Sequence, residues 1–475
     1  MRKFMVILIL LLIVILYPVK ALANTGPVTW YEYPDISLMT IDENTSIVVE
    51  KEDLHFDFSE DISTGFSMVG KVSAKYFMKN TEAKDIVAPM VFPMIQNIWA
   101  REDAHIEVLV NGEPQSYEVF YGKNADETNH NDKELVEEKV ELKDILEAVT
   151  SKPYEPINFS YNDIGTLYRI HFDSKEDMNV EAKFTLDRAG SKILSKGNNS
   201  YGYTGDTNEI MVGTSMNWEN QSVEVFSLNE EINLEIIGFN YDNSKVEVVD
   251  DFAYEIEEVK IELLEYYWGF LKPDESNYNS SSWPEDQDLY YEALDQALER
   301  NRVVTKDDIE AYLSSPRYIL LSYDVPFEAL DEKTLEVRYH TLGSMDQTKT
   351  LEPTYTYDYF LHPAKCWKDF KDLTIKITPS KTYPFILNSN LELIKENDGS
   401  YVGKFETLPN EDLSFTLYSK EKVTTIERIK RFISRNFYYF GFIGGSFLKF
   451  LGIVSVISLV VYGTLKMKKK QQGLK

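Results

Sequence analysis

The sequence predicts a mainly β protein with two antiparallel β-sandwich-like ectodomains, a small helical module between them, and one C-terminal transmembrane helix. Three observations support this fold class. Apolar and polar residues alternate over residues 30–250 and 318–420, which is typical of antiparallel sheet. The period becomes helical in between, and a long apolar segment lies near the C-terminus. With 475 residues, 43% of them hydrophobic, the chain has material for more than one core.

The first segment, residues 1–23, has the pattern of a signal peptide. Arg2 and Lys3 precede an apolar run from Phe4 to Tyr17, and Ala21-Leu22-Ala23 offers the small residues that signal peptidase recognises. We therefore expect cleavage before Asn24 and export of the chain.

Residues 24–250 are predicted to form the first β-rich ectodomain. Its clearest hairpin has the turn Asn111-Gly112, with alternating residues over 106–110 and 117–121 on either side. An acidic stretch over 124–147 interrupts the sheet and is predicted to be an exposed loop leading into a short helix. Five side chains in this loop could weakly collect Ca²⁺, but they lack the spacing and central Gly of an EF-hand. A solvated loop is therefore preferred for Asp126, Glu127, His130, Asp132 and Glu134.

Residues 251–315 are predicted to form the helical module. Pro284 suits the first position of a helix over 285–300, and Thr305 with Asp308 forms a predicted capping box before the next helix. The preceding segment is ambiguous, because residues 254–261 alternate like a strand whereas residues 259–271 also fit a helix.

Residues 316–420 are predicted to form a second sandwich, immunoglobulin-like in size. Two rows of residues are expected to point inward, one containing Leu335, Val337 and Tyr339 and the other Leu373, Ile375 and Ile377. The alternating Tyr355, Tyr357 and Tyr359 are interpreted as strand residues first and as ligand platforms second.

The C-terminal region predicts attachment to a membrane. Residues 421–436 form an expected basic juxtamembrane helix, and residues 437–465 an expected transmembrane segment. A basic cluster then begins the tail, residues 466–475. Lys449 would either extend its amine towards the headgroups or pair with an acidic group of a partner. The predicted topology is single-pass in the cell membrane, with the ectodomain outside and the C-terminus cytoplasmic.

The charge of the ectodomain excludes a nucleic-acid role. Because residues 1–23 carry +3 and residues 427–475 carry +9, the formal charge of -29 leaves -41 on residues 24–426. Binding to nucleic-acid phosphates requires a basic face, and the sequence shows none in this acidic segment. The single cysteine, Cys366, also excludes an intrachain disulfide.

The sequence predicts no catalytic, cofactor-binding or metal-binding residue. The six histidines lack zinc-motif spacing, no Gly-x-Ser-x-Gly occurs, and three glycines (Gly197, Gly202 and Gly205) are interpreted as turn residues. Cys366 beside Lys365 is interpreted as a packing thiol rather than a nucleophile. Near Trp283, three carboxylates could cleave a glycosidic bond, but first-turn helix charges explain them better: Glu285, Asp286 and Asp288.

Three stretches resemble uncharacterised cell-surface proteins of clostridia and related Gram-positive bacteria. They are Ser73-Ala74-Lys75-Tyr76 through Asn80 to Phe92-Pro93, then Asp288 to Leu294, and His362-Pro363-Ala364-Lys365 with Trp367, Phe370 and Leu373-Thr374-Ile375. The resemblance implies the same layout of signal, ectodomain and C-terminal anchor. It implies no activity and no functional residue.

The predicted function is that of a membrane-anchored extracytoplasmic binding, sensing or accessory protein. The alternative is an extracytoplasmic hydrolase that acts on cell-wall polymers through a carboxylate pair. The expected partners are the membrane, through one helix, and a membrane protein; the ligand is not identified. A cleft lined by two carboxylates from distant segments would favour the enzyme, whereas filled sandwich cores with flat faces would favour binding.

Overall fold

The computed structural model describes residues 28–432, apart from residues 43–44, 97, 99–104, 126–152, 174–177, 187–190, 206, 217–221, 243–244, 250–251 and 272–285. The described chain is mainly β, with several antiparallel sheets, as the sequence predicts. No described helix is long and apolar enough to cross a membrane. The predicted signal peptide, most of the acidic stretch, the transmembrane segment and the tail lie outside the described residues.

The chain divides into two compact units, and unit 2 is inserted into unit 1. Unit 1 comprises Met1–Ala88, Glu107–Gln115 and Pro326–Lys475, and unit 2 comprises Pro89–Ile106 and Ser116–Val325. The sequence predicts three contiguous domains, residues 24–250, 251–315 and 316–420. In the structure, each of the two units is built from separate segments of the chain. The reason is physical, because alternation identifies a strand and its buried face but not the strand with which it pairs.

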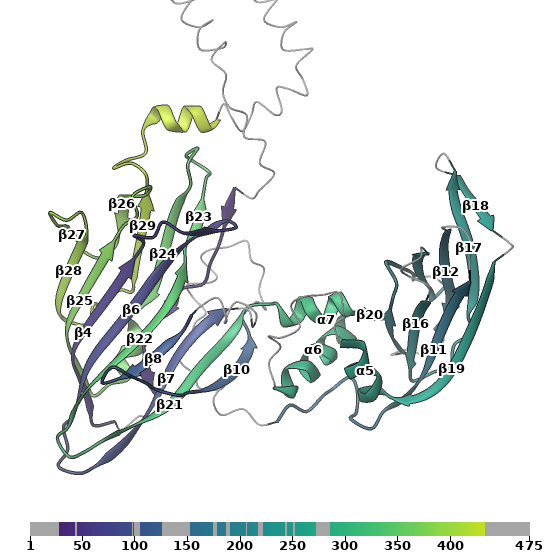
Figure 1. Cartoon of the computed structure of the whole chain (residues 1–475), viewed down its shortest axis with the longest axis horizontal. Coiled ribbons are helices and arrows are strands. Elements are labelled where there is room, and N and C mark those ends of the chain that lie inside the picture. The colour runs from purple at the N-terminus through teal and green to yellow at the C-terminus, as the bar shows by residue number, and fades with distance from the viewer. Residues whose placement is uncertain are drawn as a thin grey trace, which may run out of the picture. The chain divides into compact units, whose positions relative to one another are not determined.

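Unit 1 contains a nine-stranded and a six-stranded sheet among the described residues (Figure 1). The nine-stranded sheet follows the order β27-β28-β25-β4-β6-β22-β8-β9, with β5 added on β6. Its strands are β4 (Ile47–Asp57), β5 (Ser63–Thr64), β6 (Ser67–Asn80), β8 (Glu107–Val110), β9 (Glu113–Pro114), β22 (Glu332–Leu342), β25 (Asp369–Thr378), β27 (Ile394–Lys395) and β28 (Tyr401–Thr407). Strands from the two predicted ectodomains therefore share one sheet.

The six-stranded sheet has the order β1-β23-β24-β29-β26, with β2 on β24. Its strands are β1 (Thr29–Trp30), β2 (Asp35–Ile36), β23 (Ser344–Asp346), β24 (Thr354–Phe360), β26 (Phe385–Ser389) and β29 (Leu413–Tyr418). The predicted inward rows on β22 and β25 are confirmed, because all six of their side chains are buried. The three tyrosines of β24 are buried as well, so they are core residues and not exposed platforms.

The predicted turn at Asn111-Gly112 is confirmed, but its return strand is not the predicted one. Both residues have positive φ, 52° and 85°, which this tight turn requires. The strand that returns from this turn to pair with β8 is the two-residue β9. Residues 118–121 of the predicted return strand lie within β10 (Glu118–Asn124), which pairs instead with β21 (Arg317–Phe327).

Unit 2 contains a second pair of sheets. One follows the order β19-β11-β16-β13-β20 and the other β14-β15-β12-β17-β18, and a core of buried aliphatic and aromatic side chains draws on strands of both. Their strands are β11 (Ile164–Asp173), β12 (Met178–Thr185), β13 (Lys192–Lys196), β14 (Ser200–Thr204), β15 (Glu209–Met216), β16 (Ser222–Leu228), β17 (Glu235–Asp242), β18 (Lys245–Val249), β19 (Ala253–Glu262) and β20 (Val303–Thr305). A further sheet, mainly of unit 2, has β10, β21 and β7 (Ile86–Gln96) in this order, whereas strand β3 (Met39–Thr40) belongs to unit 1.

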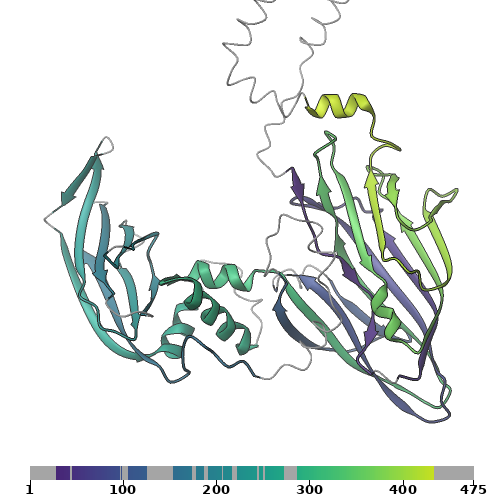
Figure 2. The same ribbon diagram turned by 180° about the vertical axis from the view of Figure 1, so that it is seen from behind.

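Three helices of unit 2 confirm the predicted helical segment: α5 (Leu263–Leu271), α6 (Gln287–Arg300) and α7 (Lys306–Leu313). These helices lie beside a sheet of the same unit (Figure 2). Their buried side chains share one apolar core with Leu167, Leu194 and Phe226 of that sheet. The capping box before α7 is confirmed, since Asp308 accepts 2.7 Å hydrogen bonds from the backbone N–H and the hydroxyl of Thr305. The ambiguous segment, residues 254–271, is first a strand and then a helix. Strand β19 ends at residue 262 and helix α5 begins at residue 263.

Candidate functional site

A cluster of carboxyl and tyrosine side chains lies in the core of unit 1. Strand β4 alternates so that Glu52, Leu54 and Phe56 are buried on one face, which gives Glu52 a position that an apolar residue would normally hold. Glu52 is 0% exposed and lies opposite Tyr76 of β6. The signal for this residue is present in the sequence, as a glutamate in the inward row of an alternating strand, but the sequence analysis missed it.

Tyrosine hydroxyls connect the two sheets within this cluster. The hydroxyl of Tyr76 lies 3.2 Å from Ser37 Oγ and 3.4 Å from the hydroxyl of Tyr359 on β24. The backbone N–H of Leu38 donates to Tyr76 at 3.2 Å. A polar group removed from water needs such partners, so this network compensates the buried hydroxyls.

The two carboxyl groups of the cluster hold protons unusually tightly. Burial raises the pKa of Glu52 to about 8, although the Tyr76 hydroxyl lowers it in part. Neither carboxylate oxygen of Glu52 makes a hydrogen bond of ordinary length to the described residues. Burial also raises the pKa of Asp35 on β2 to about 7, against the effect of the Thr341 and Tyr339 hydroxyls. Because desolvation disfavours the charged form, the protonated, uncharged form of Glu52 predominates at pH 7.

This geometry does not suit hydrolysis of a polymer. A general acid or base must come within hydrogen-bonding reach of the bond that it cleaves. Glu52 has no exposed surface, so a wall polymer cannot contact it. The cluster can hold a proton and cross-link two sheets, but it does not form the open carboxylate-lined cleft that would favour an enzyme.

His362 and Asp412 form a second pair in unit 1, across 50 residues of sequence. His362 Nδ1 lies 2.8 Å from Asp412 Oδ2, and Asp412 Oδ1 accepts the backbone N–H groups of Leu361 and His362 at 2.7 and 2.9 Å. Burial raises the pKa of Asp412, but the interactions with His362 and Leu361 outweigh burial and lower it overall. Asp412 thereby fixes the start of the short 3₁₀ helix η2 (His362–Cys366). Sequence spacing gave no sign of this pair.

Cys366, at the end of η2, is a packing thiol in the structure. Its sulfur accepts the backbone N–H of Thr40 at 3.3 Å. Burial raises the pKa of the thiol to about 11, so little thiolate exists at neutral pH. This chemistry agrees with the sequence interpretation of Cys366 and opposes a nucleophilic role.

We expect Cys366→Ser to leave folding and binding intact. A serine hydroxyl can accept the same backbone N–H, so the loss in free energy of unfolding should stay near 1 kcal/mol. Hydrogen exchange of peptides from β3 and η2 measures this. A variant that folds normally but loses its binding partner would contradict the packing role.

Two of the three carboxylates that follow Trp283 in sequence, Asp286 and Asp288, serve the fold of unit 2. Asp286 caps α6 by accepting the backbone N–H of Asp288 at 3.0 Å, and Asp288 accepts that of Tyr154 at 3.0 Å. Trp283 and Glu285 lie outside the described residues. The first-turn role predicted for Asp286 and Asp288 is thus consistent with their contacts. Within the described ranges, no group of three His, Cys, Asp or Glu side chains could hold a metal ion.

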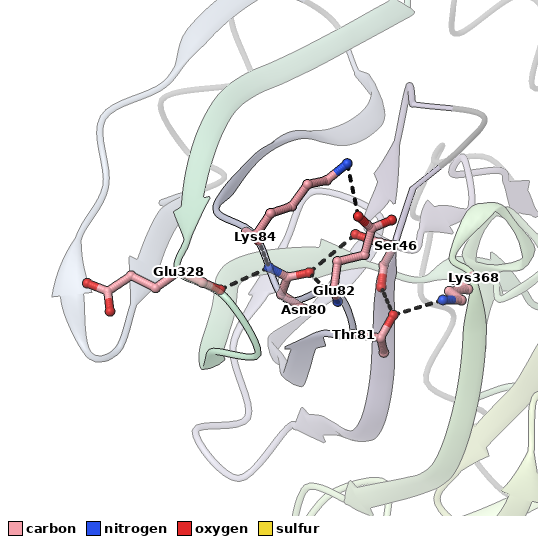
Figure 3. Close-up of polar contacts among 7 residues, drawn as sticks. All are labelled: Ser46, Asn80, Thr81, Glu82, Lys84, Glu328 and Lys368. Atoms are coloured by element: carbon pink, nitrogen blue, oxygen red, sulfur yellow. Dashed lines mark hydrogen bonds and ion pairs between the residues drawn. The ribbon is translucent and has the colours of Figure 1, made fainter.

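Asn80 organises one end of unit 1 (Figure 3). Its Oδ1 accepts from Ser46 Oγ at 3.3 Å and from the backbone N–H of Glu82 at 3.0 Å. Its Nδ2 donates to the carbonyls of Lys84 and Glu328, both at 2.9 Å. Every hydrogen-bonding position of this buried amide is therefore used, which joins the turn after β6 to the turn before β22.

Strand β19 is a long, exposed edge strand of unit 2. It lies at the end of its sheet and pairs with β11 along all ten residues. Most of its side chains are exposed on both faces, including Tyr254 and Ile256. Four of the ten residues are glutamates: Glu255, Glu257, Glu258 and Glu262.

Comparison with known proteins defines no family for this chain. No family model matches it, and no curated protein matches its sequence. Among solved structures, a Legionella pneumophila protein provisionally described as nutrient-binding is similar, with 9% sequence identity and a TM-score of 0.34 over 86% of this chain and 76% of that one. A TM-score this low establishes neither a shared fold nor a shared function. The resemblance to clostridial surface proteins stays a prediction.

Proposed function

We propose that the chain is a membrane-anchored extracytoplasmic binding or accessory protein whose strand β19 receives an extended segment of a partner. The location is supported by the sequence of residues 1–23 and 437–465, which have the patterns of a signal peptide and a membrane span.

The exposure of β19 carries the binding proposal. An edge strand offers one row of backbone donors and acceptors, and partner segments can extend the sheet by pairing with it. Long exposed edges also invite self-association, which proteins oppose with charged side chains. The four glutamates of β19 would repel a second copy of the same strand, whereas they would attract a segment rich in Lys or Arg. The expected occupant is therefore a basic extended segment of a membrane protein.

We expect the double variant Glu255→Lys and Glu258→Lys to lose most of its partner. A photo-cross-linker placed at Tyr254, which is 48% exposed, should capture one membrane protein in intact cells. The reversed charges should lower the yield at least about five-fold, since each exposed charge pair contributes on the order of 0.5–1 kcal/mol.

The matched control reverses two exposed glutamates of unit 1, with Glu396→Lys and Glu406→Lys. This variant should retain the cross-link, because it changes the net charge equally but leaves β19 intact. Equal loss in both variants would show that net charge, and not the edge strand, controls capture. Release of soluble wall fragments by the purified chain would instead establish the hydrolase.

A further inference from the structure

One side of unit 1 gathers both ends of the described chain. Thr29 at the start of β1 lies opposite Asp346, Asp346 lies opposite Thr354, and Tyr355 lies opposite Leu417 near the end of β29. Figure 1 shows the yellow-green helix of residues 425–432 on this side, beyond the ends of β26 and β29. We call it the chain-end side and define it as residues 28–32, 58–66, 344–353, 380–384 and 418–432.

Large apolar side chains are exposed on the chain-end side. Trp30 of β1 is 44% exposed and contacts Phe66, which is 39% exposed, with 5.5 Å between ring centroids. Ile62, in the same hairpin as Phe66, and Leu351 are also exposed. These residues are far apart in the sequence, and the register of the strands brings them to one side.

The helix of residues 425–432 presents a further apolar face. Three of its side chains fall within one helical sector and are 52–68% exposed: Ile426, Ile429 and Phe432. Ile433, which the sequence places on the same face, lies outside the described residues. The helix start is fixed, because Glu427 accepts the backbone N–H of Thr424 at 2.8 Å and the hydroxyl of Tyr418 at 3.4 Å. Glu427 also pairs with Lys420, so β29 and this helix are held together.

The chain-end side differs in net charge from the rest of the ectodomain. Its residues include seven acidic and seven basic side chains, whereas residues 24–426 together carry -41. Among the basic residues are Arg428, Lys430 and Arg431 of the helix. An anionic bilayer would repel most of the ectodomain but would not repel this side, and it would attract the helix.

We propose that the chain-end side of unit 1 rests in the headgroup region of an anionic bilayer. Trp30 and Phe66 would then lie at interfacial depth, where aromatic side chains are favoured, together with the apolar face of the helix. This inference rests on the proposed membrane anchor, because residues 437–465 follow the same helix in sequence. It adds a docked orientation to the anchor, in which β1 and the 58–66 hairpin contact lipid.

The test attaches a nitroxide label to single cysteines of the full chain, at positions that docking would place at different depths in the membrane. Because Cys366 is the single cysteine, Cys366→Ser provides a background for labels at Phe66→Cys and Ile429→Cys. The control label is at Leu330→Cys, an exposed apolar residue at the opposite end of β6 and β22. The 11 residues of β22 separate the two ends by about 35 Å. Each protein is incorporated into vesicles of phosphatidylcholine and phosphatidylglycerol.

Docking predicts that labels 66 and 429 become more accessible to dissolved oxygen than to an aqueous nickel reagent, while label 330 does not. If label 66 matches label 330 although the protein sediments with the vesicles, docking is overturned and the anchor stands, whatever label 429 shows. If the protein does not sediment with the vesicles, the anchor itself fails and docking fails with it. If Phe66→Cys does not fold, Leu351→Cys, an exposed residue on the same side, takes its place.

Discussion

Replacing Glu52 by glutamine is expected to stabilise unit 1 at pH 8, by on the order of 4 kcal/mol. The pKa of Glu52 is about 8 in the folded protein and near 4.5 when exposed. Between these values the unfolded chain releases a proton that the folded chain keeps. The free energy of unfolding is therefore highest below pH 4.5 and falls as pH rises, by about 1.4 kcal/mol per pH unit. Glutamine keeps the uncharged shape and does not titrate.

Hydrogen exchange of peptides from β4 and β6 measures this effect locally. The variant and the natural protein should open with similar free energies at pH 5 and should diverge at pH 8. Asp35 adds to the slope in both proteins, so the difference between them reports Glu52. The control, Glu406→Gln, changes an exposed carboxylate and should follow the natural protein at both values. Parallel pH curves for Glu52→Gln and the natural protein would show that Glu52 is not a neutral core group.

Local features of the fold could be predicted because neighbouring residues encode them. The inward row on β22 follows from a two-residue period, and the start of α7 follows from a hydroxyl and a carboxylate three residues apart. The turn at Asn111-Gly112 follows from two residues that accept positive φ. Each of these signals spans fewer than about twelve residues of sequence.

The arrangement of the sheets could not be predicted, because it depends on residues hundreds of positions apart. Strand β22 pairs with β6, whose sequence lies more than 250 residues earlier. Alternation gives each strand a buried face, but many pairings satisfy it equally well. The pair of His362 and Asp412 was missed for a related reason, because 50 residues of sequence separate the two side chains. Glu52 was missed for a different reason. The inward rows were identified from their apolar residues, and Glu52 is a charged residue in the inward row of β4.

Asn80→Ala is expected to destabilise unit 1 by about 3 kcal/mol, because it leaves four polar groups without their partner. The groups are the carbonyls of Lys84 and Glu328, the hydroxyl of Ser46 and the backbone N–H of Glu82. The loss is smaller than the sum of four single losses, since some of these groups gain water when the turns loosen. Unfolding followed by hydrogen exchange of β6 and β22 provides the measurement.

Two further variants separate hydrogen bonding from packing at this position. Asn388→Ala removes an exposed amide from unit 1 and should change the free energy of unfolding by less than about 0.5 kcal/mol. Asn80→Asp keeps the shape but turns a carboxylate oxygen towards two carbonyl oxygens, so it should be more harmful than Asn80→Ala at pH 8. Acidification should restore much of its stability, because a protonated carboxyl group can donate to a carbonyl. If Asn80→Asp is as stable as the natural protein at pH 8, the amide donors do not hold the two turns together.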